Sequence, residues 1–260
     1  MKTQFEKIYV LSLITNHSRQ EFIKHQMDDL GLEFEFIYGT AFYELTNDSD
    51  NHIINWPNVW PWKNLQASGR SFGCTISHYN AVSQAYYLGY NNVLILEDDI
   101  CFLKDKNIVE YYLNNVPNDC DFITYDLRFI DNNDLHNFCD NNDYHINKYL
   151  HIKNNIVTLC GGMCYGLMNR DIMKLYLDNQ NKQLFISDRV KDIFWTDDNS
   201  KIKRYCATQC IGLGQYLIEK MVENRYYDWA TAYESAYQYV WNLCGNDFYI
   251  PEQYLSWTQY

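Results

Sequence analysis

The stretch Val93-Leu-Ile-Leu-Glu-Asp-Asp99 decides the fold class of this chain. Four consecutive apolar residues are typical of a strand that is buried on both faces, as parallel strands are. Three acidic residues follow directly, and buried carboxylates are costly unless something positive binds them. In open α/β sheets, ligands bind at the carboxyl ends of the strands. The stretch therefore predicts a buried parallel strand that leads into a ligand site.

The N-terminal region predicts a strand, a helix and a second strand. Ile8–Leu13 is an apolar run of strand length. Ser18 and Glu21 have the spacing of a capping box, which predicts a helix that begins there and ends at Gly31. Residues 33–38 alternate between polar and apolar side chains, as a second strand does. A strand–helix–strand opening favours a parallel sheet with crossover helices.

The same alternation of elements continues along the chain. Apolar residues on one face predict a helix over 71–89, which Gly89 ends. Further predicted elements are strands at 121–125, 156–159, 163–168 and 202–206, and a helix from Asn169 to about Asp178. No linker separates two domains. We therefore expect residues 1–260 to form one α/β domain, with a mostly parallel central sheet flanked by helices.

Two aromatic regions stand outside this pattern. Residues 44–70 contain Trp56, Trp60 and Trp62, and a loop of this length is usually functional or disordered. We interpret it as an ordered or ligand-ordered flap, whose tryptophans stack on a ligand or hold the loop down. The tail at 226–260 is predicted to be helical and to cover the core or contact another subunit, which suggests a homodimer.

Composition narrows the function classes. The net charge of −12 comes without a Lys/Arg cluster, which argues against nucleic acid as a partner. An acidic protein that binds a nucleotide diphosphate needs a cation between them, so a carboxylate-held metal is favoured. No run approaches the about 20 apolar residues of a membrane span. No signal peptide is visible, and we expect a cytoplasmic protein.

The nine cysteines are odd in number and scattered, as expected of reduced thiols. The pairs Cys160/Cys164 and Cys206/Cys210 could suggest zinc, but three-residue gaps inside predicted strands and helices fit a zinc site poorly. Buried free thiols are the expectation for these residues.

The acidic trio has a specific chemical interpretation. Side chains alternate along a strand, so we expect Glu97 and Asp99 on one side and Asp98 on the other. Two carboxylates on the same side form a hard-oxygen site for Mn²⁺ or Mg²⁺, with room for phosphate oxygens. The competing interpretation of Glu97-Asp98-Asp99 is a solvated acidic turn.

A longer series of blocks resembles glycosyltransferase family 25, whose members build lipooligosaccharide or glycosylate collagen hydroxylysine. The blocks cover most of the chain and occur in the family's order: Ile8–Leu13 with Arg19, Gly73-Cys-Thr-Ile-Ser-His78, Gly89 through Ile95-Leu-Glu-Asp-Asp99, Asp121–Leu127, Gly161–Asn169 and Cys206–Gln215. Two features depart from the family pattern. Residues 15–19 replace an arginine-rich turn, and a proline expected near Cys206 is absent.

The resemblance implies a GT-A-like nucleotide-sugar-binding fold and an inverting transfer of hexose, galactose or glucose, from a UDP-sugar with Mn²⁺ or Mg²⁺. The acceptor hydroxyl would belong to collagen-type (galactosyl)hydroxylysine or to a lipooligosaccharide-type glycan. Such a transfer needs a general base near the acceptor. Asp188 is the first candidate because it follows Gly161–Asn169, which resembles the family's glycine-started hairpin, and the alternatives are Asp126, Asp197 and Asp198.

The other predicted roles concern the donor. We interpret Glu97 and Asp99 as metal ligands and the following as donor-binding residues: Ser12, Arg19, Ser77, His78, Glu97 and Asp98. For His78 a core histidine with satisfied hydrogen bonds is an equal alternative, and for Trp56, Trp60 and Trp62 the role is an acceptor or lid contact.

Two other function classes compete with the transferase. A nucleotidyltransferase would also use a carboxylate-held metal ion to bind phosphates. However, the chain has no glycine- and lysine-rich phosphate loop near its N-terminus. A non-catalytic sugar-binding or scaffold protein with the same fold is the main alternative. The intact Glu97-Asp98-Asp99 argues against loss of catalysis.

Overall fold

The central element of the computed structural model is a sheet of seven strands: β1 (Lys7–Leu13), β2 (Glu35–Gly39), β5 (Val93–Glu97), β7 (Phe122–Thr124), β8 (Tyr149–His151), β9 (Cys164–Leu167) and β10 (Arg204–Ala207). The strand order is β2-β1-β5-β9-β7-β10-β8. The structure describes residues 1–39, 54–56, 65–67, 69–125, 149–151, 164–182, 202–207, 211–214 and 248–249.

Five of the seven strands run in the same direction. β1 is parallel to β2 and β5, and β10 is parallel to β7. β9 pairs antiparallel with both β5 and β7, so these two strands are themselves parallel. β8 pairs antiparallel with β10 at the sheet edge. The predicted α/β class with a mostly parallel central sheet is confirmed.

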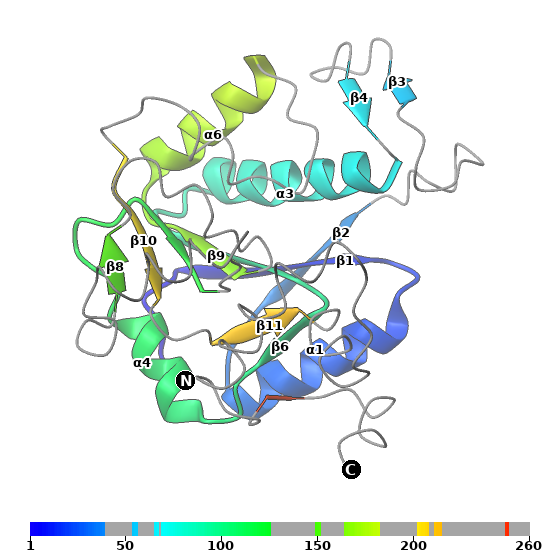
Figure 1. Ribbon diagram of the computed structural model, residues 1–260. Helices are drawn as coiled ribbons and strands as arrows, with labels where there is room; N and C mark the ends of the chain where they lie inside the picture. The colour runs from blue at the N-terminus through cyan, green and yellow to red at the C-terminus, as the bar shows by residue number, and fades with distance from the viewer. Residues whose placement is uncertain are drawn as a thin grey trace, which may run out of the picture.

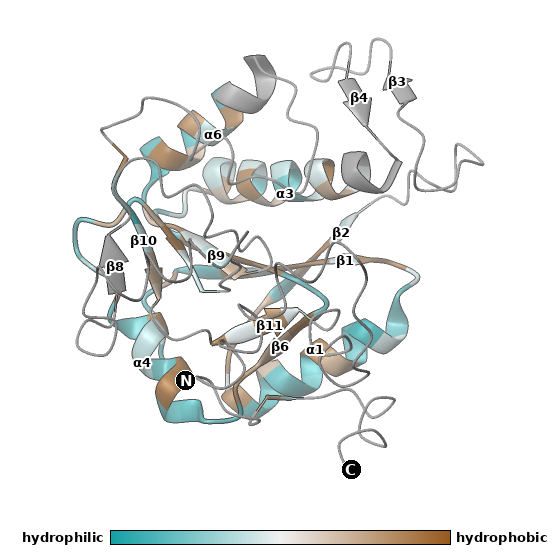
Figure 2. Cartoon of the chain, in the orientation of Figure 1, coloured by the Kyte–Doolittle hydropathy of each residue, from teal (hydrophilic) through white to brown (hydrophobic). Residues whose placement is uncertain are grey.

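Helices cover both faces of this sheet (Figure 1). One face carries α3 (Gly69–Leu88) and α6 (Arg170–Lys182), which contact each other. The opposite face carries α1 (His17–Leu30) and α4 (Lys106–Asn114). Figure 2 shows apolar colours along the central strands and polar colours on the helix surfaces. Burial of these apolar faces against the sheet is the main stabilising term of such a layered fold.

The ends of the helices follow local chemistry, with one correction. α1 begins at His17 rather than Ser18, and its N-cap is Asn16, which makes no side-chain cap bond. The predicted capping box is therefore wrong, because Ser18 lies inside the helix. The side-chain nitrogen of Asn16 donates to the distant Asp98. Gly31 ends α1 as predicted, in the left-handed conformation with φ 67° that glycine adopts without strain. The predicted cap of α6 is confirmed, since Asn169 Oδ1 accepts a 2.9 Å bond from the Ile172 amide.

A small second sheet follows the acidic trio directly. β6 (Ile100–Phe102) pairs antiparallel with β11 (Gly212–Gly214), and neither strand was predicted. The buried Gln26 of α1 satisfies the other edge of β6. Its amide nitrogen donates to the Ile100 carbonyl at 3.0 Å, and its oxygen accepts from the Phe102 amide at 2.7 Å. The chain immediately after the trio is thereby fixed to α1.

Parts of two predicted regions are also described. Within residues 44–70, β3 (Ile54–Trp56) and β4 (Leu65–Ala67) pair antiparallel. In the aromatic tail, Phe248 is buried and forms an isolated antiparallel bridge with Leu103. The rest of the tail, the strand predicted at 156–159 and Asp188 lie outside the described residues. The single-domain organisation and the homodimer stay predictions.

The described cysteines are free thiols. Cys101, Cys120, Cys164 and Cys206 are buried, and Cys74 is half-buried. Cys160 and Cys210, the partners in the two zinc-like pairs, lie outside the described residues. Among the helices that the structure describes, none is long and apolar enough to cross a bilayer.

Candidate functional site

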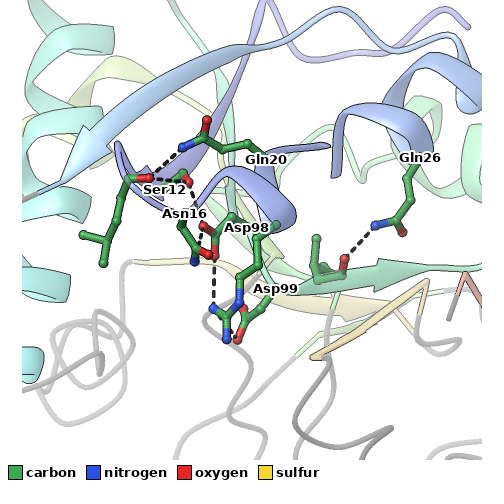
Figure 3. A network of polar contacts seen from close by, with 9 residues as sticks. Ser12, Asn16, Gln20, Gln26, Asp98 and Asp99 are labelled. Atoms are coloured by element: carbon green, nitrogen blue, oxygen red, sulfur yellow. Dashed lines mark hydrogen bonds and ion pairs between the residues drawn. The ribbon is translucent and has the colours of Figure 1, made fainter. Parts of the chain in front are cut away.

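Ser12 and Asp98 bring together the carboxyl ends of two neighbouring parallel strands. The Ser12 hydroxyl donates a 2.7 Å hydrogen bond to Asp98 Oδ2. The Asp98 amide donates to the Leu11 carbonyl at 3.0 Å, which extends the β1–β5 pairing one residue beyond β5. Figure 3 shows Ser12 and Asn16 turned toward Asp98, with Asp99 beside them. Asp98 is therefore anchored by the end of β1.

Arg19 of α1 contacts two carboxylates of the trio. Its Nη1 lies 3.2 Å from Asp98 Oδ1 and 3.6 Å from Asp99 Oδ2. The Arg19 side chain is 42% exposed, whereas the side chains of Asp98 and Asp99 are 9% and 16% exposed. A guanidinium at the surface thus offsets part of the negative charge below it. A second residue of α1 fixes the turn before the helix: Gln20 Nε2 donates a hydrogen bond to the Leu13 carbonyl at 2.6 Å.

Burial has the largest effect on the pKa of Asp98. It raises the pKa of this carboxyl above its usual value, and the Ser12 hydrogen bond and the Arg19 charge act in the opposite direction. Every oxygen contact described above points to a structural role for this side chain: Ser12 and Asn16 bond to Oδ2, and Arg19 bonds to Oδ1. Asp98 holds the turn that carries Glu97 and Asp99.

Glu97 has different neighbours, on the face of the sheet that α3 covers. Its Oε1 lies 3.1 Å from Nε2 of His78, a residue of α3 whose side chain is fully buried. His78 Nδ1 lies 2.8 Å from the Tyr165 hydroxyl of β9. The Glu97 side chain is 24% exposed. The chain of polar contacts therefore begins in the core at Tyr165 and ends at a partly exposed carboxylate.

β5 ends at Glu97, and Asp98 and Asp99 form a turn rather than a continuation of the strand. The alternation expected for a strand does not govern these two residues. Asp98 and Asp99 share Arg19, while Glu97 contacts His78. Asp98 is the most buried of the three side chains.

Cys74, His78 and Glu97 form a group that could hold a metal ion. Cys74 and His78 are four residues apart on α3, and one ligand atom from each of the three residues lies within 4.8 Å of the others. Among the described residues, no other group of three or more His, Cys, Asp and Glu side chains has that geometry. It combines a sulfur, an imidazole nitrogen and a carboxylate oxygen.

Ser77 faces the end of β2. Its hydroxyl donates to the Gly73 carbonyl one turn earlier in α3, at 2.8 Å. A Cβ atom at Gly39, the last residue of β2, would lie only 2.3 Å from Ser77 Oγ. The absence of a side chain at Gly39 therefore permits α3 to pack closely on the sheet at this edge. The hydrogen bond of Ser77 within its own helix gives it a packing role.

The family comparison is consistent with this arrangement. The model of glycosyltransferase family 25, described as an LPS biosynthesis protein, matches residues 5–185. The chain belongs to glycosyltransferase family 25. No curated protein sequence matches it. The match includes α1, α3, β1, β5, β6 and β9, whereas β11, the partner of β6, lies beyond it.

Membership in family 25 establishes a glycosyltransferase, which acts between a sugar donor and an acceptor. The mostly parallel sheet flanked by helices is consistent with the GT-A-like fold that the resemblance implied. The acidic trio lies at the carboxyl edge of β5, where ligands bind in open α/β sheets.

The structure brings together some of the predicted site residues. Ser12, Arg19, Asp98 and Asp99 form one network, and His78 and Glu97 form another. Trp56 lies in β3. The remaining candidates lie outside the described residues: Asp126, Asp188, Asp197, Asp198, Trp60 and Trp62.

Three residues of these networks were missed in the sequence: Cys74, Asn16 and Tyr165. Cys74 precedes His78 by four residues, a spacing that places two ligands on one helix face, and this signal was available. Asn16 and Tyr165 carry no comparable signal. Their contacts, with Asp98 and His78, depend on how separate elements pack. The role of Gln26 also depends on packing, since it supports a three-residue strand.

Proposed function

We propose that the protein is a metal-dependent inverting glycosyltransferase that moves a hexose from a UDP-sugar to an acceptor hydroxyl. The observation that carries the proposal is the acidic turn after β5. It is anchored by Ser12 and Arg19 and presents Glu97 and Asp99 as its two more exposed carboxylates. A diphosphate leaving group is strongly anionic, so an acidic site can accept it only together with a cation.

The proposed metal ligands are Glu97 and Asp99. Their oxygen donors suit Mn²⁺ and Mg²⁺, and both side chains are partly exposed at the ligand edge. Asp98 fits this role less well, because it is the most buried of the three and already accepts hydrogen bonds from Ser12 and Arg19. When bound, Mn²⁺ or Mg²⁺ would neutralise the diphosphate and stabilise it as a leaving group.

The protein's own side chains position the donor in this proposal. Arg19 is the exposed cation nearest the trio among the described residues that contact it, and it can extend toward a phosphate while it stays close to Asp99. His78 acts through Glu97, which it contacts directly. Ser12 and Ser77 support the carboxyl edge of the sheet. Ser12 holds Asp98 by a hydrogen bond, and Ser77 packs closely against Gly39.

The general base of the proposal is Asp188, with Asp126 as the alternative. Inversion requires a base that accepts the proton of the acceptor hydroxyl while the hydroxyl oxygen attacks the anomeric carbon from the side opposite the diphosphate. Asp126 directly follows Tyr125 in the sequence, and β7, which precedes it, is parallel to β5. Because β7 and β5 are parallel, Asp126 is the residue to substitute next if Asp188 proves dispensable. Trp56, Trp60 and Trp62 are the proposed acceptor or lid residues.

The donor hexose is galactose or glucose. The proposed acceptor is a lipooligosaccharide-type glycan or a collagen-type (galactosyl)hydroxylysine. The family description, an LPS biosynthesis protein, favours the glycan. The alternative is a sugar-binding or scaffold protein that has the family fold without turnover, and it would bind free sugar in the absence of metal.

The experiment that tests the proposal measures UDP release from UDP-galactose and UDP-glucose with Mn²⁺, with lactose-type glycan, hydroxylysine-peptide and galactosyl-hydroxylysine acceptors in separate reactions. Release that requires one donor, one acceptor and the metal establishes the transferase and names its substrates. Thermal stabilisation by free sugar alone, without UDP release or Mn²⁺-dependent UDP binding, would establish the alternative.

A further inference from the structure

We infer that Tyr165 and His78 form a buried hydrogen-bond relay that positions the Glu97 carboxylate, with His78 fixed as the tautomer protonated at Nε2. The inference rests on the proposed function, because it assigns to Glu97 a ligand-facing role that must be held in place. Tyr165 and His78 are positioning residues in this scheme, since they act on the donor site through Glu97.

The register of the sheet places Tyr165 on the correct face. Tyr165 of β9 is the partner of Ile95 in β5, two residues before Glu97. Side chains two residues apart on a strand lie on the same face, so Tyr165 and Glu97 both point toward α3. His78 of α3 lies between them, at 2.8 Å from the Tyr165 hydroxyl and 3.1 Å from Glu97 Oε1. Three separate elements therefore contribute one residue each.

With a neutral His78 imidazole and an ionised Glu97, the three groups permit one arrangement of protons. A neutral imidazole has one N–H donor and one acceptor nitrogen, and an ionised carboxylate only accepts. The contact between His78 and Glu97 then requires the proton on Nε2. Nδ1 is left as an acceptor, and the Tyr165 hydroxyl is the donor beside it. Burial raises the pKa of Tyr165 well above its usual value, so this hydroxyl keeps its proton.

The Tyr165 hydroxyl consequently holds the His78 ring in the orientation that presents Nε2–H to Glu97. Both side chains are completely buried, so water does not compete for the bond between them. If the hydroxyl were absent, Nδ1 would lose its donor and the ring would lose the bond that fixes its orientation. The Nε2–H donor would then be aimed less accurately at Glu97, and the contact that holds the carboxylate would weaken.

A metal ion held by Cys74, His78 and Glu97 requires the opposite tautomer. A metal binds the unprotonated Nε2, and the proton on Nδ1 would be donated to the Tyr165 hydroxyl, as the second ring nitrogen of a ligating histidine usually donates. The position of one proton therefore separates the relay from a metal site at the same three residues.

The first test reads the tautomer directly. In protein with ¹⁵N-labelled histidine, long-range ¹H–¹⁵N NMR distinguishes Nε2–H from Nδ1–H, and His78→Gln assigns the signal by its loss. Protein treated with chelator is measured first, before Zn²⁺ or Mn²⁺ is added. The relay predicts Nε2–H for wild type without metal and after addition of Zn²⁺. An Nδ1–H tautomer, or a shift to it with Zn²⁺, would overturn the relay.

The second test removes one hydroxyl. Tyr165→Phe should shift the ring ¹⁵N signals of His78, because Nδ1 loses its hydrogen bond, and weaken Mn²⁺-dependent UDP binding by about tenfold, the lower end of the usual effect of such supporting residues. The matched control is Tyr9→Phe, which deletes the hydroxyl of another fully buried tyrosine on the central sheet and should change neither readout. Equal behaviour of Tyr165→Phe and wild type in both readouts would refute the inference.

A double-mutant cycle distinguishes loss of the relay from a loss of packing. His78→Gln keeps an N–H donor for Glu97 but removes the Nδ1 acceptor of the Tyr165 hydroxyl. Tyr165→Phe should therefore cost about tenfold in UDP affinity in the wild-type background and much less in the His78→Gln background, which is the non-additivity expected of contacting residues. Additive effects would mean that Tyr165 acts on the fold alone, and the relay would be discarded. The tautomer readout needs no substrate, so it stands or falls independently of the UDP-release experiment.

Discussion

The Ser12 hydroxyl donates a 2.7 Å hydrogen bond to Asp98 Oδ2, and this bond fastens the end of β1 to the turn after β5. The two residues are far apart in the chain, yet they define the edge at which the proposed donor site lies. Because Arg19 binds the other oxygen of the same carboxylate, Asp98 is a structural centre for the trio. In the proposed function, its two neighbours Glu97 and Asp99 bind the metal.

Ser12→Ala should lower the free energy of unfolding by about 1–3 kcal/mol, because it removes a hydrogen bond to a buried carboxylate. Urea unfolding followed by circular dichroism measures the change. Ser18→Ala is the matched control on the exposed surface of α1, and it should stay within about 0.5 kcal/mol of wild type. Equal stability of the two variants would show that the Ser12 contact contributes nothing.

Asp99→Ala should abolish Mn²⁺-dependent binding of UDP while the fold stays intact, because its proposed role is directed toward the ligand. Isothermal titration calorimetry of UDP with and without Mn²⁺ is the measurement. Asp29→Ala removes an exposed carboxylate of α1 away from the trio and serves as the control. Unchanged UDP affinity in Asp99→Ala would remove Asp99 from the metal site.

Asp188→Asn should leave UDP binding unchanged and lower the transfer rate by about 100-fold or more, the usual contribution of a general base. A coupled assay of UDP release and calorimetry separate the two effects. If turnover persists near the wild-type rate, Asp188 is not the base, and Asp126→Asn is then measured in the same way.

Gln26→Leu should destabilise the protein by about 2 kcal/mol or more, because the Ile100 carbonyl and the Phe102 amide would both lose a buried partner. Gln84→Leu removes an amide whose bond to Glu35 is exposed, and it should cost about 1 kcal/mol or less. Chemical unfolding of both variants gives the comparison. Similar losses would mean that the Gln26 bridge does not stabilise β6.

Cys101 and Cys120 should resist iodoacetamide at pH 8 in the folded protein. The thiolate is the reactive form, and burial raises the pKa of both thiols, so the reactive fraction stays small until the pH rises much further. The half-buried Cys74 should react faster. Peptide mass spectrometry before and after unfolding in urea measures the labelling. Rapid native labelling of Cys101 would contradict its burial.

The elements with long, regular patterns could be predicted from the sequence. β1, α3 and β5 have continuous apolar runs or a clear helical face, and the structure has each of them within two residues of the expected bounds. The position of the acidic trio at the carboxyl edge also followed from topology. These signals are local, so a single sequence contains them.

The contacts that assemble the site could not be predicted in the same way. Asn16 looks like an unused residue before a capping box, and only the packing of α1 beside β5 gives its amide a tertiary partner. Tyr165 reaches His78 because β9 pairs antiparallel with β5 in one particular register. β6 and β11 are three residues long, too short for a period to be recognised.

The place of β9 in the sheet also has a consequence for the order in which the protein folds during synthesis. β9 lies between β5 and β7, although the ribosome makes it after both. Until β9 emerges, β2, β1 and β5 can pair into a parallel sheet that ends in an open edge, which is an aggregation hazard. β7 has no neighbour on that side during the same interval. Insertion of β9 between two waiting strands is a non-local step, and we expect it to limit the rate of folding.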